Sequence, residues 1–277
     1  MIEVGYIGNV SHHLTANDLS LDQVPPDLTI SGKAQLVRPF PQFSNVSWIN
    51  PSIGDSTYHG GFIRLEKRMS GRLSFLAHYT FSKFLDDVEA ANEFGTTGSY
   101  MDAYHRNLDK GLSGSDIPHR FVGEMLYQLP KLRGLKLGLM QNIESGPVFT
   151  VITSTNTTNA FPAGPLRPNL LHNPGLSDRT VNRWFDTTAF ANPAPLTFGN
   201  SPRSGLRGAP VITTDATLEK TFQVKEGVKV DVRGEFYNLF NHAIFNIPGF
   251  TLGAPDFGVV SSARAPRTAQ LAMRVAF

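Results

Sequence analysis

Three groups of side chains have the residue types that bind metal ions or move protons. Asp86-Asp87 with Glu89 place three carboxylates close together, and carboxylates serve as calcium ligands or acid/base pairs. His12-His13 and His119-Arg120 offer groups that bind metals or phosphate. The carboxylate spacing matches no EF-hand loop, and no third ligand stands at a useful spacing from these histidines. We therefore expect solvated loop residues here, with no metal and no cofactor.

The sequence also lacks the short motifs of common enzyme classes. It contains no G-x-S-x-G elbow, no H-E-x-x-H helix, no G-x-x-x-x-G-K-[ST] loop and no G-x-G-x-x-G turn. The net charge is only +2 and the basic residues are scattered, which argues against a nucleic-acid partner. The absence of cysteine excludes disulfides and thiolate metal sites. These features predict a protein that is not an enzyme.

The elements that would position these residues are β-strands, because apolar and polar residues alternate with a period of two. The clearest run is Leu73, Phe75, Ala77, Tyr79 and Phe81, interleaved with polar residues. Ser70-Gly71, Pro130 to Gly134 and Glu226-Gly227 join three pairs of such runs, as tight hairpins require. The pattern predicts eight strands, which lie at about Ile2–Tyr6, Gly61–Arg68, Arg72–Ser82, Phe121–Leu129, Leu135–Leu139, Ile212–Val224, Val228–Phe236 and Leu271–Phe277.

Short turns alternate with long connections along the chain. The long connections run from about Asn9 to Asp55, Leu85 to Pro118, Ile152 to Pro210 and Asn241 to Pro266, and they are rich in Pro, Asn, Gly, Ser and Thr. Long loops without secondary structure are unusual in compact soluble domains. Short turns on one side and long loops on the other are the rule in outer-membrane barrels. We therefore predict an all-β fold, an antiparallel transmembrane β-barrel that is partial, with about eight strands.

Most charged residues of the strands lie opposite the apolar stripe. Arg or Lys on the lipid face near the bilayer midplane costs roughly 2–4 kcal/mol, so this separation suits a barrel wall. We assign five of these residues as possible lumen-facing groups, which would form a charge ladder or line a substrate path. They are Arg64, Glu66, Asp231, Arg233 and Glu235. Five residues do not follow the pattern: Lys67 and Lys220, which can snorkel from strand ends, and Gln141, Val122 and Leu126, which the alternation does not explain.

The last residues alternate and end on an aromatic side chain. Leu271, Met273, Val275 and Phe277 form the apolar set of this segment. The segment resembles the C-terminal assembly signal of bacterial outer-membrane proteins, although an ordinary edge strand would look the same.

An ordered series of longer motifs resembles the barrels of TonB-dependent receptors of the Oar-like kind. The series covers nearly the whole chain, and its members include Tyr79-Thr80-Phe81-Ser82-Lys83, His119-Arg120-Phe121, Arg167-Pro168-Asn169, Trp184-Phe185-Asp186, Leu206-Arg207-Gly208 and Glu235-Phe236-Tyr237-Asn238. The resemblance implies a bacterial outer-membrane location and a receptor or transporter that takes up a bulky substrate. It also implies lipid and the barrel-assembly machinery as partners, and TonB only through a plug domain.

Residues 1–277 show no plug and no signal peptide, so we expect the chain to be the C-terminal portion of a longer barrel. The expected first strand, Ile2–Tyr6, is shorter than the roughly 9–11 residues that span a bilayer. We therefore expect an open sheet without a hydrogen-bonded ladder between Ile2–Tyr6 and Leu271–Phe277. Two alternatives stay open: a self-closing eight-strand barrel that acts as an anchor or adhesin, and a secreted β-sandwich with an apolar interior that acts as a binding module or hydrolase.

Overall fold

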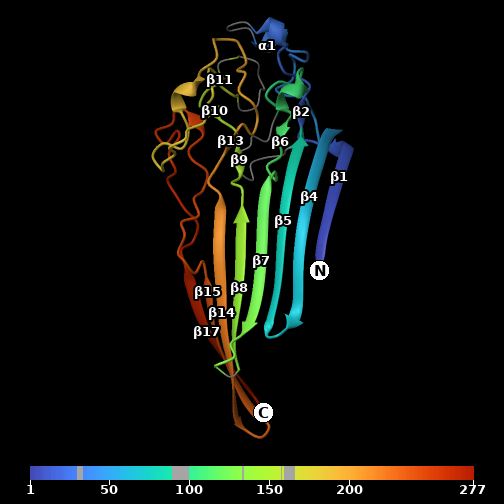
Figure 1. Cartoon of the computed structure of the whole chain (residues 1–277). Helices are drawn as coiled ribbons and strands as arrows, with labels where there is room; N and C mark the ends of the chain where they lie inside the picture. Colours follow the sequence, from blue (N-terminus) through green and yellow to red (C-terminus); the bar gives the residue numbers. More distant parts are fainter. Residues whose placement is uncertain (30–33, 89–99, 133, 157, 159–165) are drawn as a thin grey trace.

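The structure is a computed structural model that describes residues 1–29, 34–88, 100–132, 134–156, 158 and 166–277. It consists of one tall sheet with a layer of folded connections at one end (Figure 1). We call this layer the loop layer, and it is formed by the described residues within 16–51, 87–118, 145–210 and 238–267. Among the described residues, none of the helices has the length and apolar character needed to cross a membrane.

Eight long strands form the main sheet, and each is antiparallel to its neighbours. Their order across the sheet is β1-β4-β5-β7-β8-β14-β15-β17, with short β6 paired to β5. The strands are β1 (Ile2–Thr15), β4 (Ser52–Ser70), β5 (Leu73–Asp86), β7 (His119–Gln128), β8 (Leu135–Glu144), β14 (Val211–Lys225), β15 (Val228–Tyr237) and β17 (Thr268–Ala276). The all-β, eight-strand prediction is confirmed.

In its described residues, the loop layer contains short elements only. Its strands are β2 (Leu19–Ser20), β3 (Ser47–Trp48), β6 (Gly111–Leu112), β9 (Val148–Phe149), β10 (Ile152–Thr153), β11 (Asn169–Leu170), β12 (Phe190–Ala191), β13 (Leu206–Arg207) and β16 (Thr251–Leu252). Its helices are α1 (Ala34–Val37) and the 3₁₀ turns η1 (Pro26–Leu28), η2 (Arg106–Asp109) and η3 (Thr187–Ala189). The described parts of the four connections, which were expected to be structureless, therefore contain short strands and turns.

The three predicted hairpin turns lie at the opposite end of the sheet. Each contains a glycine in the left-handed region, with φ of 59° at Gly71, 80° at Gly134 and 78° at Gly227. A side chain at such a φ is strained, so glycine is the residue that these turns require. The short turns and the long connections therefore lie at opposite ends of the sheet, as predicted (Figure 1).

The prediction for the first strand was wrong in length. β1 extends over 14 residues, to Thr15, instead of ending near Tyr6. Its pairing with β4 runs without interruption from Ile2↔Leu65 to Ser11↔Ser56, and a bulge follows before Leu14. The ladder continues because the backbone of β4 offers partners even where glycine and polar residues break the alternation of β1. The strand is thus long enough to span a bilayer.

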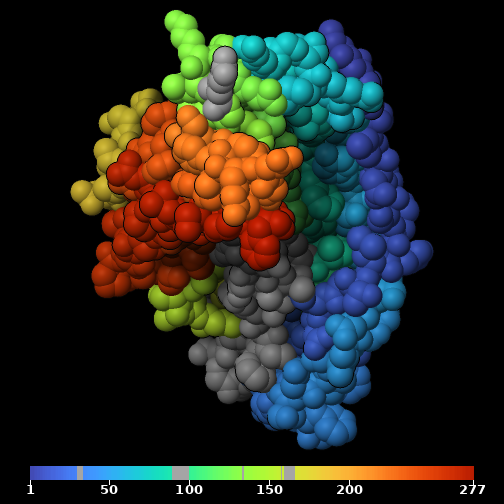
Figure 2. All heavy atoms as spheres, turned by 90° about the horizontal axis from the view of Figure 1, so that it is seen from below, coloured from blue at the N-terminus to red at the C-terminus, as the bar shows by residue number. Residues whose placement is uncertain are grey.

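The sheet is nevertheless open, as predicted. In the described part of the chain, β1 and β17 are the two ends of the strand order and do not pair with each other. Viewed along the strands, the sheet curves from β1 (blue) through β4 and β7 to β15 and β17 (Figure 2). The sandwich alternative required the apolar stripe to be buried, but Phe75 and Phe81 on that stripe are exposed.

Local contacts account for two of the residues that did not fit the sequence pattern. Lys67 Nζ donates to the backbone oxygens of Ser70 and Leu73, at 2.6 and 2.8 Å, so its charge is held at the hairpin end. Gln141 Nε2 donates to Thr213 O at 2.9 Å, and its Oε1 accepts from the Thr214 hydroxyl at 2.6 Å. A polar amide on the apolar face is therefore satisfied by the neighbouring strand.

Candidate functional site

The concave face of the sheet carries the charged residues proposed for the lumen. Arg64 and Glu66 on β4 line a groove on this face. Arg64 Nη2 lies 2.8 Å from Glu66 Oε2, and its Nη1 lies 3.4 Å from Glu3 Oε2 on β1. Charges on neighbouring strands therefore form a ladder at this edge of the sheet.

The other three residues lie on the same face of β15. Arg233 pairs with Glu235, which also accepts from Gln270 on β17, while Asp231 accepts from the Thr221 hydroxyl at 2.7 Å. The structure therefore brings the five residues together in two groups, one on β4 and one on β15. That this face lines a lumen stays a prediction.

The groove on the concave face has a volume of about 570 Å³ and is lined by residues from β4, β5, β7, β8, β14 and β15. Its middle is apolar, because Leu76, Leu126 and Met140 lie among the charged residues. We call these three residues the apolar patch. Leu126 and Met140 remain 37% and 44% exposed, so the patch has no cover in the described structure. Leu126 was one of the unexplained residues; Val122 lies on the same face, opposite His78.

The loop layer contains a buried hydrophobic core. Phe149 and Phe185 are almost fully buried, and Phe185 makes edge contacts with Phe190 and Phe257 at ring-centroid distances of 5.7 and 5.1 Å. These rings come from the connection between β8 and β14 and from the one between β15 and β17. The indole N–H of Trp184 donates to Arg207 O at 2.8 Å at the margin of this core. Sequence reasoning missed it because these aromatic residues follow no period.

Arginine–aspartate pairs stabilise the loop layer: Arg38–Asp22 lies within one connection, and the other pairs link segments that are far apart in the sequence. The pairs with both side chains buried are Arg38–Asp22, Arg167–Asp109 and Arg203–Asp86, while Arg207–Asp116 is partly buried. A buried guanidinium must be paired and hydrogen-bonded, because its desolvation is costly. Arg167 meets this condition: it also donates to Ser201 O and Leu108 O, both at 2.9 Å.

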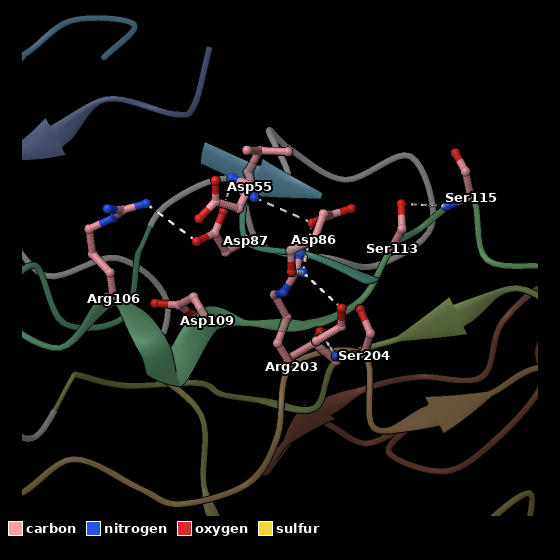
Figure 3. A network of polar contacts seen from close by, with 12 residues as sticks. Asp55, Asp86, Asp87, Arg106, Asp109, Ser113, Ser115, Arg203 and Ser204 are labelled. Carbon is pink, nitrogen blue, oxygen red and sulfur yellow. Dashed lines mark hydrogen bonds and ion pairs between the residues drawn. The ribbon is translucent and has the colours of Figure 1, made fainter. Parts of the chain in front are cut away.

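Figure 3 shows how two of these connections meet at the end of β5. Arg203 reaches Asp86 with a 2.7 Å bond to its Oδ1, and Asp87 accepts from Arg106 at 3.4 Å. Asp86 and Asp87 were expected to be solvated loop residues. That expectation was wrong, because both carboxylates form ion pairs with arginines. Glu89 lies outside the described residues. Beside this network, burial raises the pKa of Tyr100, and the nearby Arg106 guanidinium opposes that shift.

The candidate histidines are separate from one another. His12 Nδ1 lies 2.7 Å from Asp55 Oδ1, and His119 Nδ1 lies 2.8 Å from the Tyr79 hydroxyl. Within the described ranges, no three His, Asp or Glu residues are placed to hold a metal ion. His13 has a positive φ of 57° and lies at the irregular end of β1.

The residues assigned to the assembly signal lie on the edge strand β17 and just after it. Leu271, Met273 and Val275 alternate along β17, and Phe277 follows it. All four are exposed, because β17 pairs on one side only, with β15. This arrangement leaves an amphipathic edge strand, as the sequence pattern predicted, but does not test its role in assembly.

Comparison with known proteins identifies the family. The family model described as "Outer membrane beta barrel domain" matches residues 1–270, which is nearly the whole chain. No curated protein matches the chain. The match agrees with the antiparallel sheet, its exposed apolar face and its polar concave face. The chain therefore belongs to the outer membrane β-barrel domain family, whose place is the outer membrane of Gram-negative bacteria.

Proposed function

We propose that this chain is part of the barrel wall of a TonB-dependent receptor and that its concave face surrounds a plug domain. The apolar patch carries this proposal. A lumen filled with water would leave Leu126 and Met140 exposed to solvent on a face that is otherwise charged. Full burial of such a side chain contributes roughly 1.5–3 kcal/mol. Because each side chain is already more than half buried, a cover over it would stabilise the complex of wall and plug by about 1 kcal/mol more.

The charges around the patch suit a protein cover better than a lipid one. Arg64, Glu66, Glu124 and Asp215 line the same groove, and lipid tails cannot solvate them. A folded domain can place polar groups against these charges and apolar groups against the patch, as protein interfaces commonly do. A plug in this position would gate the passage of a bulky substrate, as the family resemblance implies.

The proposal assigns no catalytic role to the chain. Its partners would be outer-membrane lipid on the convex face, the barrel-assembly machinery during insertion, and TonB through the plug. The loop layer would then form part of the extracellular surface that substrates meet first.

Photo-crosslinking in the native strain tests the proposal. A photoreactive amino acid at Leu126 faces the groove, and the same probe at the neighbouring Tyr127, which pairs with Leu73 on the outward stripe and does not line the groove, provides the matched control. We expect Leu126 to crosslink to a plug domain, within the same polypeptide or on another one, and Tyr127 to crosslink to lipid only. Absence of protein crosslinks at both positions, together with compact heat-resistant migration, would support a small self-closing anchor or adhesin instead.

A further inference from the structure

Two tyrosine–histidine pairs lie on the outward face of the sheet, near the loop layer. The Tyr6 hydroxyl is 2.6 Å from His59 Nδ1, and the Tyr79 hydroxyl is 2.8 Å from His119 Nδ1. In both pairs the rings are stacked, with centroids 6.1 and 6.3 Å apart. All four residues are exposed. The pairs come from four strands, so they form a band across the sheet.

The tyrosines orient the histidines as hydrogen-bond donors. A phenol is a stronger donor than acceptor, so we infer that each tyrosine O–H donates to Nδ1 and that the imidazole proton then resides on Nε2. Because Nδ1 is already occupied, the Nε2–H groups of His59 and His119 are the ones available to a ligand. A protonated imidazole also carries a hydrogen on Nε2, so both forms offer a donor.

Lys83 adds a positive charge between these histidines. It is the Cα partner of His59 across the β4–β5 ladder, and Phe81, two residues before it, is the partner of His119. Directly opposed residues are about 5 Å apart and diagonal ones about 7–8 Å. Lys83 is exposed and forms no ion pair with any residue that the structure describes. His59 and His119 thus lie on the two strands that flank Lys83, and all three side chains are on the same part of the outward face.

The nearest carboxylates on this face are already engaged. Asp55 lies further toward the loop layer and contacts His12 at 2.7 Å, and Asp87 lies beside it and contacts Arg106 at 3.4 Å. Neither carboxylate is bonded to Lys83, so the ammonium group of Lys83 has no ion-pair partner from the loop-layer side among the described residues.

Lys83 lies at the level expected for the boundary between lipid headgroups and acyl chains. From Leu73 at the hairpin end, the outward residues of β5 are Leu73, Phe75, Ala77, Tyr79 and Phe81, and Lys83 is the first charged one. Ten residues of strand measure about 34 Å, or about 26 Å along the membrane normal at a tilt of about 40°. The apolar band of outer-membrane barrels is about 25 Å tall, so Lys83 reaches the headgroup level.

We propose that His59, Lys83 and His119 bind a phosphate group of an outer-leaflet lipid. The two Nε2–H groups and the ammonium would donate to the phosphate oxygens, and Phe81 and Tyr79 would contact the first acyl carbons below them. Hydrogen bonds to a phosphate are stronger when the donor is charged than when it is neutral. The site would fix the height and rotation of the wall in the outer leaflet.

Lipid binding by protein purified from the outer membranes of its host tests this site. The variant H59N/K83Q/H119N removes the donors at exposed positions, and K131Q/K225Q removes two exposed lysines near the hairpin end as the matched control. Each protein is placed in phosphatidylcholine nanodiscs in which about one lipid in ten is a bis-phosphorylated lipid A. The number of lipid A molecules that each protein retains is measured by native mass spectrometry.

We expect the triple variant to retain lipid A at least ~10-fold less than the wild type, while the control retains it equally. Circular dichroism and heat-modified migration should be unchanged, which excludes misfolding. Equal retention by the triple variant, or equal retention of dephosphorylated lipid A by the wild type, would overturn the proposal. Displacement of the lipid by millimolar inorganic phosphate would show that the site takes a soluble anion, which also contradicts it.

Discussion

The pair formed by Arg167 and Asp109 offers the sharpest test of the loop layer. Asp109 lies in η2, before β6, and Arg167 lies in the connection between β8 and β14. Their side chains are only 6% and 2% exposed. The second oxygen of Asp109 accepts from the backbone N–H of Met101 at 3.0 Å. Asp109→Ala therefore removes the partner of a buried guanidinium and one backbone contact.

The expected cost follows from burial. Removing one partner of a buried ion pair costs about 3–5 kcal/mol, because the remaining charge stays desolvated and unpaired. At 1.4 kcal/mol for each factor of ten, local opening of the loop layer should become roughly 100 to 4,000 times more frequent. The sheet should be unaffected, since neither residue belongs to a long strand.

Hydrogen exchange of protein taken from its native membrane measures this opening directly. Arg183→Ala is the matched control, because Arg183 is 59% exposed and lies 4.0 Å from Asp186. An exposed pair of this kind contributes about 0–1 kcal/mol, so exchange should change by less than about fivefold. The double variant D109A/R167M should recover much of the loss, since it leaves no unpaired buried charge. Exchange in residues 100–118 that is equal in D109A and the Arg183 control would refute the argument.

Three further predictions concern the membrane and assembly. A spin label at Phe75 should be accessible to oxygen in a lipid-like environment and a label at Ser74 should not; a shielded, tightly packed label at Phe75 would contradict the outward face. In intact cells, an impermeant label should reach residues 184–202 and miss Glu226-Gly227; labelling of that turn would reverse the topology. Deleting Phe277 should sharply reduce membrane insertion although one such ring contributes only roughly 1.5–3 kcal/mol; normal insertion would mean that the C-terminal resemblance is coincidence.

The strands and turns could be predicted because the information for them is local. Alternation over Leu73 to Phe81 identifies β5, and a glycine at position 71 or 227 marks a hairpin whose strands are neighbours in sequence. β1 beyond Tyr6 could not be predicted in this way. Its alternation is broken by Gly8 and by polar residues, and its partners on β4 lie about 50 residues away.

The loop layer could not be predicted because its contacts depend on distant residues. Arg167 and Arg207 lie in motifs that carried the family resemblance, yet nothing beside them in sequence indicates Asp109 or Asp116 as partners. Gln141 is similar, since the backbone oxygen that satisfies it belongs to Thr213, 72 residues further along the chain. Carboxylates such as Asp86 look solvated until an arginine from another connection reaches them.

The separation between paired residues also sets an order of events as the protein matures. Arg203 meets Asp86 across 117 positions, and Arg207 meets Asp116 across 91. Each tight hairpin, by contrast, closes between residues that are near neighbours in the sequence. Distant contacts form slowly, because the intervening chain must first be brought together. We therefore expect the hairpin end to be established while the connections are still accessible to proteases, and resistance to cleavage in residues 100–118 and 166–210 to mark the final stage of maturation.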